Sequence, residues 1–454
     1  MSEQDATLDE FTDDAESYQQ SRSQAASRFW GMIPKEWEIA DPDTVYEVNP
    51  NPESDEEPNT YIEMDALDTE LPWPRYFGKR KASDYSGKTF TAGDTLFARI
   101  TPCTENGKAA LVPEIKTQIG IGSTEFAVLS PNRERILPWY LFYVAKSHPV
   151  HNYAVSRMRG STGRQRVPFS VFRRELDIAL PPFEEQRKIA SVLYTVDQAI
   201  QKTEEIREKA KSAEEVAKTE LFTHGYSEWD VQESVGWRCR ANQVPKDWDV
   251  KTADELMEIT RGASPRPRSD DSLFDGDIPW IKIGDANRDE SKRIEEVDSY
   301  VTEKGKNRSK FVEEGTLLVA NSGATCGFSI FAGVDGCVHD GWLILRGYDD
   351  FSPDFLYHYI NWNYDYLQSL SLGSAQTNLS TSLFGRLDIP VPVLQEQQQI
   401  VDALDSISEV VAHASTEINR LQCLKQGLMQ DLLSGEIRTH DKDIEVVDEV
   451  LQYG

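Results

Sequence analysis

The stretch Leu176-Asp177-Ile178-Ala179-Leu180-Pro181-Pro182-Phe183-Glu184-Glu185-Gln186 returns later in the chain as Leu387-Asp388-Ile389-Pro390-Val391-Pro392-Val393-Leu394-Gln395-Glu396-Gln397, 211 positions further on. The same shift relates Ile33-Pro34-Lys35-Glu36-Trp37-Glu38 to Val244-Pro245-Lys246-Asp247-Trp248-Asp249, and it carries Leu221-Phe222 onto Leu432-Leu433. An internal repeat decides the architecture of a chain before any single residue does. The sequence therefore predicts two like halves, one after the other.

A long helix is predicted directly after each copy of this stretch, because apolar or small side chains recur there every three or four residues. Gly225 and Gly435 follow the predicted ends, where glycine commonly stops a helix. We expect the two apolar stripes to pair as an antiparallel coiled coil; two surface helices, each packed on its own domain, are the alternative. The predicted seam consists of Ile189, Val196, Ile206 and Leu221 in the first helix and Ile400, Ile407, Leu421 and Leu432 in the second.

The segments between the repeated stretches, residues 38–175 and 249–386, diverge almost completely. Short β-rich runs separated by Gly, Asn and Asp turns come first in each, and helical stretches follow. The predicted fold class is therefore α/β, with two mixed α/β modules alternating with two long paired helices in a pseudo-twofold internal repeat. The predicted boundaries are an acidic disordered extension at 1–30, the first module at 31–180, a helix at 181–225, a linker at 226–243, the second module at 244–391, a second helix at 392–436 and an acidic tail at 437–454.

The composition predicts a globular protein, since 39% of the 454 residues are hydrophobic and 28% are charged. We find no apolar run of about 18 residues and no apolar leader, so we expect a cytoplasmic protein without a membrane span. The five cysteines are scattered, and His148 and His151 lack partners at a ligand spacing, so no metal site is expected.

The net charge of −29 is unevenly distributed. Residues 1–60 hold 16 acidic and 3 basic side chains, whereas residues 71–170 hold 6 acidic and 15 basic ones. A densely carboxylated surface keeps a protein soluble in a salt-rich cytoplasm, so we expect a halophilic source. The basic block needs a separate explanation.

The sequence contains no recognisable catalytic site. Leu180-Pro181-Pro182-Phe183 resembles the tetrapeptide of amino-methyltransferases but has leucine where a side-chain oxygen must accept from the target amine. A phosphate-binding loop of the G-x-x-x-x-G-K-[S/T] type is also missing. We therefore predict no catalytic residues, no metal and no cofactor bound by this chain.

Arginine and lysine in loop-rich modules favour an interaction with DNA, because arginine contacts phosphates and reads guanine edges with two hydrogen bonds. A solvated charged face explains any single cluster equally well, but the pattern occurs in both modules. The candidates in the first module are Arg75, Lys79, Arg80, Lys81, Arg99, Arg157, Arg159, Arg164, Gln165 and Arg166, and those in the second are Arg261, Arg266, Arg268, Lys282, Lys304, Lys306, Arg308, Lys310 and Gln376.

The order of these parts resembles the specificity subunit of type I restriction-modification systems over about residues 30–438. The acidic extension and tail depart from the family's usual pattern, so we expect charge attraction to supply less of the affinity for DNA. The matching stretches are Ile278-Pro279-Trp280-Ile281-Lys282-Ile283-Gly284-Asp285, Ser123-Thr124-Glu125-Phe126-Ala127-Val128-Leu129, the repeated stretches up to Ile189 and Ile400, and the helix ends Leu221-Phe222 and Leu432-Leu433-Ser434-Gly435-Glu436.

This resemblance implies a non-catalytic reader of double-stranded DNA that serves in defence against foreign DNA. Each module would be a target recognition domain for one half of a bipartite, asymmetric sequence, and the helices would set the spacing. Methyltransferase (modification) subunits using S-adenosylmethionine and restriction/translocase subunits using ATP and Mg²⁺ would join it. The other hypotheses are a coiled-coil protein-interaction scaffold that does not bind DNA and a self-contained adenine methyltransferase, which the missing motifs disfavour.

Overall fold

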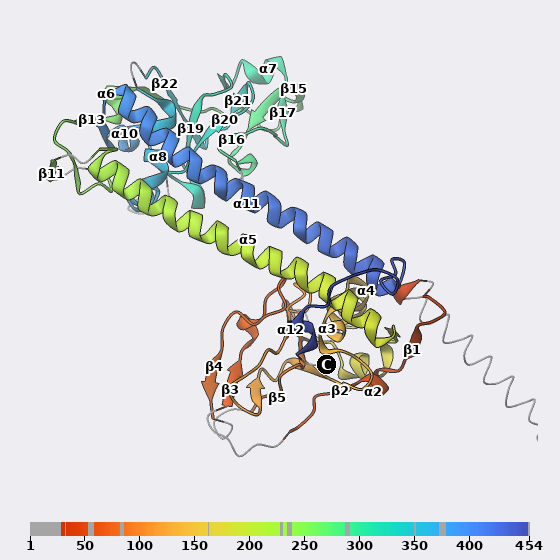
Figure 1. Ribbon diagram of the computed structural model, residues 1–454. Coiled ribbons are helices and arrows are strands. Elements are labelled where there is room, and N and C mark those ends of the chain that lie inside the picture. Colours follow the sequence, from red (N-terminus) through yellow and green to blue (C-terminus); the bar gives the residue numbers. More distant parts are fainter. Residues whose placement is uncertain are drawn as a thin grey trace, which may run out of the picture. The chain divides into compact units, whose positions relative to one another are not determined.

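The computed structural model describes residues 29–31, 33–52, 59–81, 86–161, 163–227, 230–233, 238–286, 291–348, 351–371 and 378–452 (Figure 1). The chain forms two compact units. The first unit comprises residues 1–202 and 418–454, and the second comprises residues 203–417. In the described part of the chain, we find no helix that is both long enough and apolar enough to span a membrane.

The first unit contains two four-stranded sheets, ordered β2-β9-β6-β7 and β4-β3-β8-β5, and the short pair β1-β10. Its elements are β1 (Glu38–Ala40), α2 (Pro42–Val45), β2 (Tyr46–Val48), β3 (Asn59–Ile62), β4 (Gly78–Arg80), β5 (Lys88–Phe90), β6 (Thr95–Ala98), β7 (Ala109–Leu111), β8 (Gly120–Gly122), β9 (Phe126–Pro131), α3 (Pro138–Lys146), α4 (His148–Ser156), β10 (Ile178–Leu180) and α12 (Asp448–Leu451).

The second unit repeats this plan with a five-stranded sheet, β14-β22-β19-β20-β16, a four-stranded sheet, β17-β15-β21-β18, and the short pairs β13-β23 and β11-β12. Its elements are β11 (Val231–Glu233), β12 (Gln243–Pro245), β13 (Asp249–Thr252), α6 (Ala253–Leu256), β14 (Glu258–Arg261), β15 (Phe274–Ile281), β16 (Arg293–Ile294), β17 (Tyr300–Val301), α7 (Glu303–Lys306), β18 (Lys310–Val312), β19 (Leu317–Ala320), β20 (Ser329–Ala332), β21 (Gly336–Val338), β22 (Trp342–Arg346), α8 (Pro353–Trp362), α9 (Tyr364–Ser371), α10 (Thr381–Phe384) and β23 (Asp388–Val391).

Two long helices, α5 (Phe183–His224) and α11 (Leu394–Ser434), follow the repeated stretches. Each unit contains the beginning of one helix and the end of the other. In the first unit Asp197 of α5 contacts Lys425 of α11, and in the second unit Glu214 of α5 contacts Ser408 of α11. The residue numbers therefore increase along α5 in the direction in which they decrease along α11. The helices are therefore antiparallel, and the predicted fold class is confirmed.

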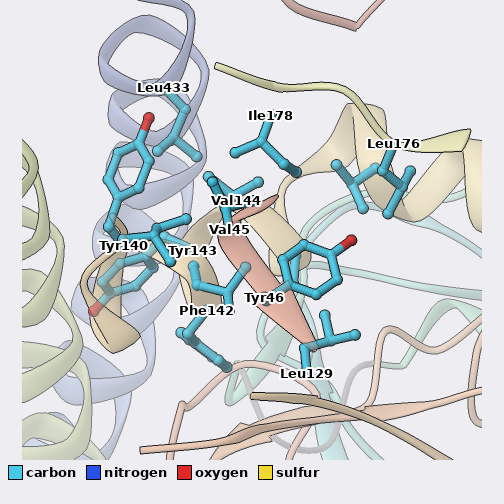
Figure 2. Packing of buried hydrophobic residues seen from close by; sticks show 14 of the residues in the cluster. Val45, Tyr46, Leu129, Tyr140, Phe142, Tyr143, Val144, Leu176, Ile178 and Leu433 are labelled. Atoms are coloured by element: carbon cyan, nitrogen blue, oxygen red, sulfur yellow. The ribbon is translucent and has the colours of Figure 1, made fainter. Parts of the chain in front are cut away.

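The core of the first unit joins a module to both long helices. Side chains of α3, β2, β9 and β10 surround one another, and Leu433 from the end of α11 lies among them (Figure 2). The beginning of α5 adds Ile189 and Leu193, which are fully buried. The second unit is built in the same way, with Phe222 from the end of α5 and Leu404 from the beginning of α11 in its core. The repeated dipeptides at the helix ends are thus core residues of the opposite half.

The repeated tryptophan holds the start of each long helix in the same way. Trp37 Nε1 donates to the carboxylate of Glu185 over 2.9 Å, and Trp248 Nε1 donates to that of Glu396 over 3.0 Å. A buried carboxylate needs such donors, because an unpaired one costs several kcal/mol, on the order of 3–5. The repeated glutamate therefore fixes the start of each long helix to its own module.

The repeated glutamine fixes a second helix in each unit. Gln186 accepts from the backbone N–H of Leu137, at the start of α3, over 2.9 Å. Gln397 accepts from the backbone N–H of Ser352, at the start of α8, over 2.8 Å. Positions in α3 and α8 therefore correspond at a shift of 215, counted from these two bonds (352 minus 137).

One predicted seam residue is wrong. The side chain of Ile206 is 53% exposed, because half-buried positions of α5 recur at 203, 207, 210 and 214, and residue 206 is one place off this face. Among the other seam candidates, Ile189, Val196, Ile400 and Leu432 are buried, and Leu221, Ile407 and Leu421 are half-buried.

The predicted disorder of the N-terminal extension is wrong where the structure describes that segment, and the predicted acidic tail is also packed against the first unit. Phe29 and Trp30, inside the predicted extension, are buried in the first core, and Trp30 Nε1 donates to the backbone oxygen of Asp177. In the predicted acidic tail, Val450 is fully buried, and the backbone oxygen of Glu449 accepts from Trp139. A few apolar residues within an acidic segment are enough to fix it, whereas the averaged composition hides them. Residues 1–28 lie outside the described residues.

Candidate nucleic-acid interface

A backbone crossing at the end of the central strand positions the basic residues of the first module. Arg99 directly follows β6, and its N–H donates to the backbone oxygen of Glu125, just before β9, over 3.0 Å. The N–H of Val167 donates in turn to the backbone oxygen of Arg99 over 2.8 Å. Three segments that are far apart in the sequence therefore meet at one point.

The second module has the same crossing with different side chains. The N–H of Asn321, directly after β19, donates to the backbone oxygen of Gly341, just before β22, over 2.8 Å. The N–H of Leu379 donates to the backbone oxygen of Asn321 over 2.7 Å. The two modules therefore share the backbone hydrogen bonds of this crossing but differ in the side chains attached to it.

In the first module the crossing gathers several of the predicted arginines. Glu125 accepts from Arg99 over 3.1 Å and forms an ion pair with Arg166 over 2.8 Å. The guanidinium of Arg99 also lies 4.1 Å from the ring centre of Phe169, and its side chain is 15% exposed. Arg99 is therefore largely engaged within the protein, whereas Arg166 is more accessible.

Among the neighbouring candidates, Arg159 and Gln165 have backbone contacts close to this crossing. Arg157 pairs with Glu175 over 2.8 Å. The backbone of Arg159 is bridged to that of Arg166, and the side chains of Arg159 and Arg164 are exposed. Gln165 is half-buried, and its backbone oxygen accepts from Thr101.

The remaining candidates of the first module lie around β4. Arg75 forms a 2.7 Å ion pair with Asp68 and keeps 61% of its side chain exposed. Lys79 and Arg80 lie on the strand itself, the guanidinium of Arg80 lies 4.5 Å from the ring centre of Tyr61, and all three cations are exposed. Lys81, next in the chain, is also exposed.

Two arginines of the second module contact Asp340, one at its backbone and one at its carboxylate. Arg261 Nε donates to the backbone oxygen of Asp340 over 2.8 Å, and Arg266 lies 3.6 Å from the Asp340 carboxylate with 67% of its side chain exposed. Partial burial opposes ionisation, but a hydrogen bond from Ser264 and the neighbouring charges hold the pKa of Asp340 below its usual value. Asp340 is therefore a fixed negative charge among more numerous positive ones.

His339 extends the same cluster. Its Nε2 lies 3.2 Å from Arg268 Nη2, and its ring lies 5.8 Å from that of Trp280, over which Lys282 is also placed. Burial lowers the pKa of His339, and the positive charges of Arg268, Lys282 and Arg266 lower it further against the pull of Asp340. This shift favours the neutral form of His339 at pH 7, and the arginines and lysine supply the positive charge of this surface.

Of the other candidates in the second module, Arg308 contacts this cluster directly. Arg308 Nη1 donates to the backbone oxygen of Arg266 over 2.6 Å. Lys304 pairs with Asp270, and Lys306 lies over the ring of Phe311. Lys310 is exposed on β18, and Gln376 lies outside the described residues.

Reading the sequence overlooked the acceptors that orient these cations. Glu125, Glu175 and Asp340 each hold at least one predicted arginine. Glu125 directly precedes β9, and Asp340 lies two residues before β22. An acidic residue close to the start of this strand in both halves was the available signal, and the divergence of the modules concealed it.

The chain matches known proteins along both halves. The family model of the type I restriction modification DNA specificity domain matches residues 43–212 and again residues 245–422. A Methanocaldococcus jannaschii protein described as the specificity subunit of type I restriction enzyme MjaX is 24% identical over 426 residues, which cover 90% of this chain and 95% of that one. The HindI specificity subunit of Haemophilus influenzae is 23% identical over 411 residues, which cover 77% of this chain and 88% of that one.

The fold is similar to that of a solved relative. The crystal structure of the type I restriction-modification S subunit from M. genitalium superposes with a TM-score of 0.57 at 15% identity, and the match covers 88% of this chain and 96% of that one. Since the family model covers most of each half, the chain belongs to the family of type I restriction-modification DNA specificity subunits.

Proposed function

We propose that this chain reads a bipartite, asymmetric DNA sequence, with one half recognised by each module, for a type I restriction-modification complex. The observation that carries the proposal is the match of one DNA specificity domain to both halves of the chain. Two divergent modules on a repeated frame suit two different half-sites, because specificity resides in side chains while the frame fixes their position.

The arginine cluster of the second module supports this proposal. Arg261, Arg266 and Arg268 are exposed, and Asp340 and His339 hold parts of them in place. A pre-positioned guanidinium loses little freedom when it binds, and a bidentate contact to guanine discriminates against other bases by about 1–3 kcal/mol. The cluster thus has the chemistry of a base-reading surface.

The chain itself is proposed to be non-catalytic and to assemble with modification subunits that use S-adenosylmethionine and restriction subunits that use ATP and Mg²⁺. Exposed apolar side chains on the long helix α11, such as Leu394 and Val410, are suited to partner contacts. In such a complex the DNA target would be chosen by this chain and modified by its partners.

Methylation-aware sequencing tests the proposal in the source organism. We expect a bipartite motif carrying N6-methyladenine that disappears when the gene is deleted and returns with the wild-type gene. The double variant Arg266→Ala/Arg268→Ala is expected to lose or relax one half of the motif only, because these residues lie in one module.

Lys202→Ala/Lys209→Ala on α5 is the matched control, since it removes two exposed positive charges outside the modules. This control should restore the complete motif. The purified complex is then tested for duplex binding at the salt concentration of the organism's cytoplasm, because counterion release favours binding less as the salt concentration rises. Absence of both the motif and duplex binding would support the protein-interaction scaffold instead.

A further inference from the structure

The contact between the two long helices in the first unit has a counterpart of different chemistry in the second. The sequence shift of 211 relates Asp197 to Ser408 and Glu214 to Lys425. In the first unit Asp197 forms an ion pair with Lys425 over 2.5 Å. In the second, the equivalent positions form a hydrogen bond from Ser408 Oγ to Glu214 Oε1 over 2.9 Å. Equivalent sites therefore carry an acid–base pair at one end and an acid–hydroxyl pair at the other.

The charged pair is deeply buried. The side chain of Asp197 is 0% exposed and that of Lys425 is 7% exposed. Tyr143 donates to the other carboxylate oxygen of Asp197 over 2.8 Å, and Lys425 donates to the backbone oxygen of Glu70 over 2.8 Å. Removing either charge leaves the other one buried without its partner, which is strongly unfavourable.

Like-with-like pairing between two copies would place different groups together. Because the halves repeat, two copies of α5 could pair antiparallel about a true twofold axis with the register seen between α5 and α11. Asp197 of one copy would then face the partner's Glu214, which sets two carboxylates against each other. Two copies of α11 would place Lys425 against the partner's Ser408, with no carboxylate at that position.

We propose that Asp197, Lys425, Glu214 and Ser408 form a pairing code that selects the α5–α11 pair over α5–α5 and α11–α11 pairs between copies of this chain. Buried polar residues in coiled coils specify partners in this way, and repulsion in the wrong pair matters as much as attraction in the right one. The code concerns how the scaffold closes on itself and does not depend on DNA binding.

Glu214→Lys/Ser408→Asp in the full chain tests the code. This variant keeps an acid–base pair between α5 and α11 in the second unit. It also makes both like pairs complementary, because Asp197 would face a lysine and Lys425 would face an aspartate. Wild-type and variant chains are each prepared as an equal mixture of ¹⁵N-labelled and unlabelled protein, chemically cross-linked and analysed by mass spectrometry.

We expect cross-links between α5 peptides of differently labelled copies to rise at least tenfold in the variant over the wild type. The charge-matched control Glu208→Lys/Ser406→Asp, at exposed helix positions, should behave as the wild type. Equal inter-copy cross-linking in the wild type and the variant would overturn the proposal.

A second variant keeps the proposal testable if the first variant does not fold. Asp197→Lys/Lys425→Asp reverses the charged pair, so that residue 197 of one copy becomes attractive to the partner's Glu214. It is likewise expected to raise α5–α5 cross-links. Circular dichroism establishes which variants are folded, and a folded variant of either kind that stays as monomeric as the wild type contradicts the code.

Discussion

The two units share a backbone plan but differ in how polar groups close the contact with the long helices. In the first unit Tyr143 on α3 donates to Asp197 of α5, which also pairs with Lys425 of α11. In the second, the corresponding residue of α8, His358, lies 2.7 Å from Asp405 of α11. The residues that the repeat preserves thus build the shared backbone plan. The groups that determine helix pairing and the pH dependence of stability lie at positions where the two halves differ.

The largest expected difference between the units comes from Lys425→Met. This change leaves Asp197 buried without its charge partner, and breaking such a pair costs about 3–5 kcal/mol. Ser408→Ala, at the equivalent contact of the second unit, removes one neutral donor from a carboxylate that also pairs with Lys218, so about 1 kcal/mol is expected. Hydrogen exchange followed by mass spectrometry gives the opening free energy of each unit separately. If both variants lowered the opening free energy of their units equally, the charged pair would contribute no more to stability than the neutral hydrogen bond.

The helix starts provide the next comparison. Glu185 accepts from Trp37 and also forms a bidentate ion pair with Arg438, whereas Glu396 accepts from Trp248 and from the backbone N–H of Tyr226. Glu185→Gln should therefore destabilise the first unit by about 2 kcal/mol, since bonds to charged groups contribute about 1.5–3 kcal/mol.

Glu396→Gln should cost the second unit about 1 kcal/mol or less, because the donors described for Glu396, Trp248 and the backbone of Tyr226, are neutral. Urea titrations monitored by hydrogen exchange compare the two variants under one condition. A larger loss for Glu396→Gln than for Glu185→Gln would contradict the expected order.

Acid should weaken the second unit through His358. Burial lowers the pKa of His358 below its ordinary value of 6.5, although the bond to Asp405 opposes this shift. The unfolded chain therefore takes up a proton near pH 6.5 that the folded unit resists, and stability falls as the pH drops below 6.5. One such proton changes stability by at most about 1.4 kcal/mol per pH unit.

We would measure the free energy of unfolding of the wild type and of His358→Gln between pH 7.5 and 5.5. The difference between the two pH profiles gives the contribution of His358. The variant should lose less stability than the wild type on acidification. The pKa of Tyr143, at the corresponding place in the first unit, is raised by burial, so that residue does not titrate in this range. A pH slope that is the same with and without His358 would exclude the histidine as its source.

The smallest effect is expected from Ile206→Lys. Because this side chain is exposed, the change should alter stability by no more than about 0.5 kcal/mol. Leu404→Lys, on the buried face of α11, places a charge in the core and should destabilise the second unit by several kcal/mol, on the order of 3. Thermal unfolding of both variants separates the exposed face from the packed one.

The fold was predictable from the repeat, since Leu221-Phe222 and Leu432-Leu433 already marked the ends of two like helices and proved to be core residues. The seam was only partly predictable. Counting apolar residues selected Ile206 and could not select Lys425, because a buried lysine is compatible with the core only through Asp197, which lies on another helix. The basic residues of the modules were recognisable as a class, but their acceptors, such as Asp340, depend on tertiary contacts between segments far apart in the sequence.

The discontinuity of the first unit has a consequence for biosynthesis. The second unit is one continuous run, residues 203–417, and leaves the ribosome complete. The first unit cannot complete its fold until the last part of the chain is synthesised, because Arg438 contacts Glu185 and the backbone of Glu449 contacts Trp139. Domains usually fold in the order of their synthesis. Here the module translated first is finished last, so a nascent chain released between residues 418 and 438 carries an incomplete first unit and a complete second one.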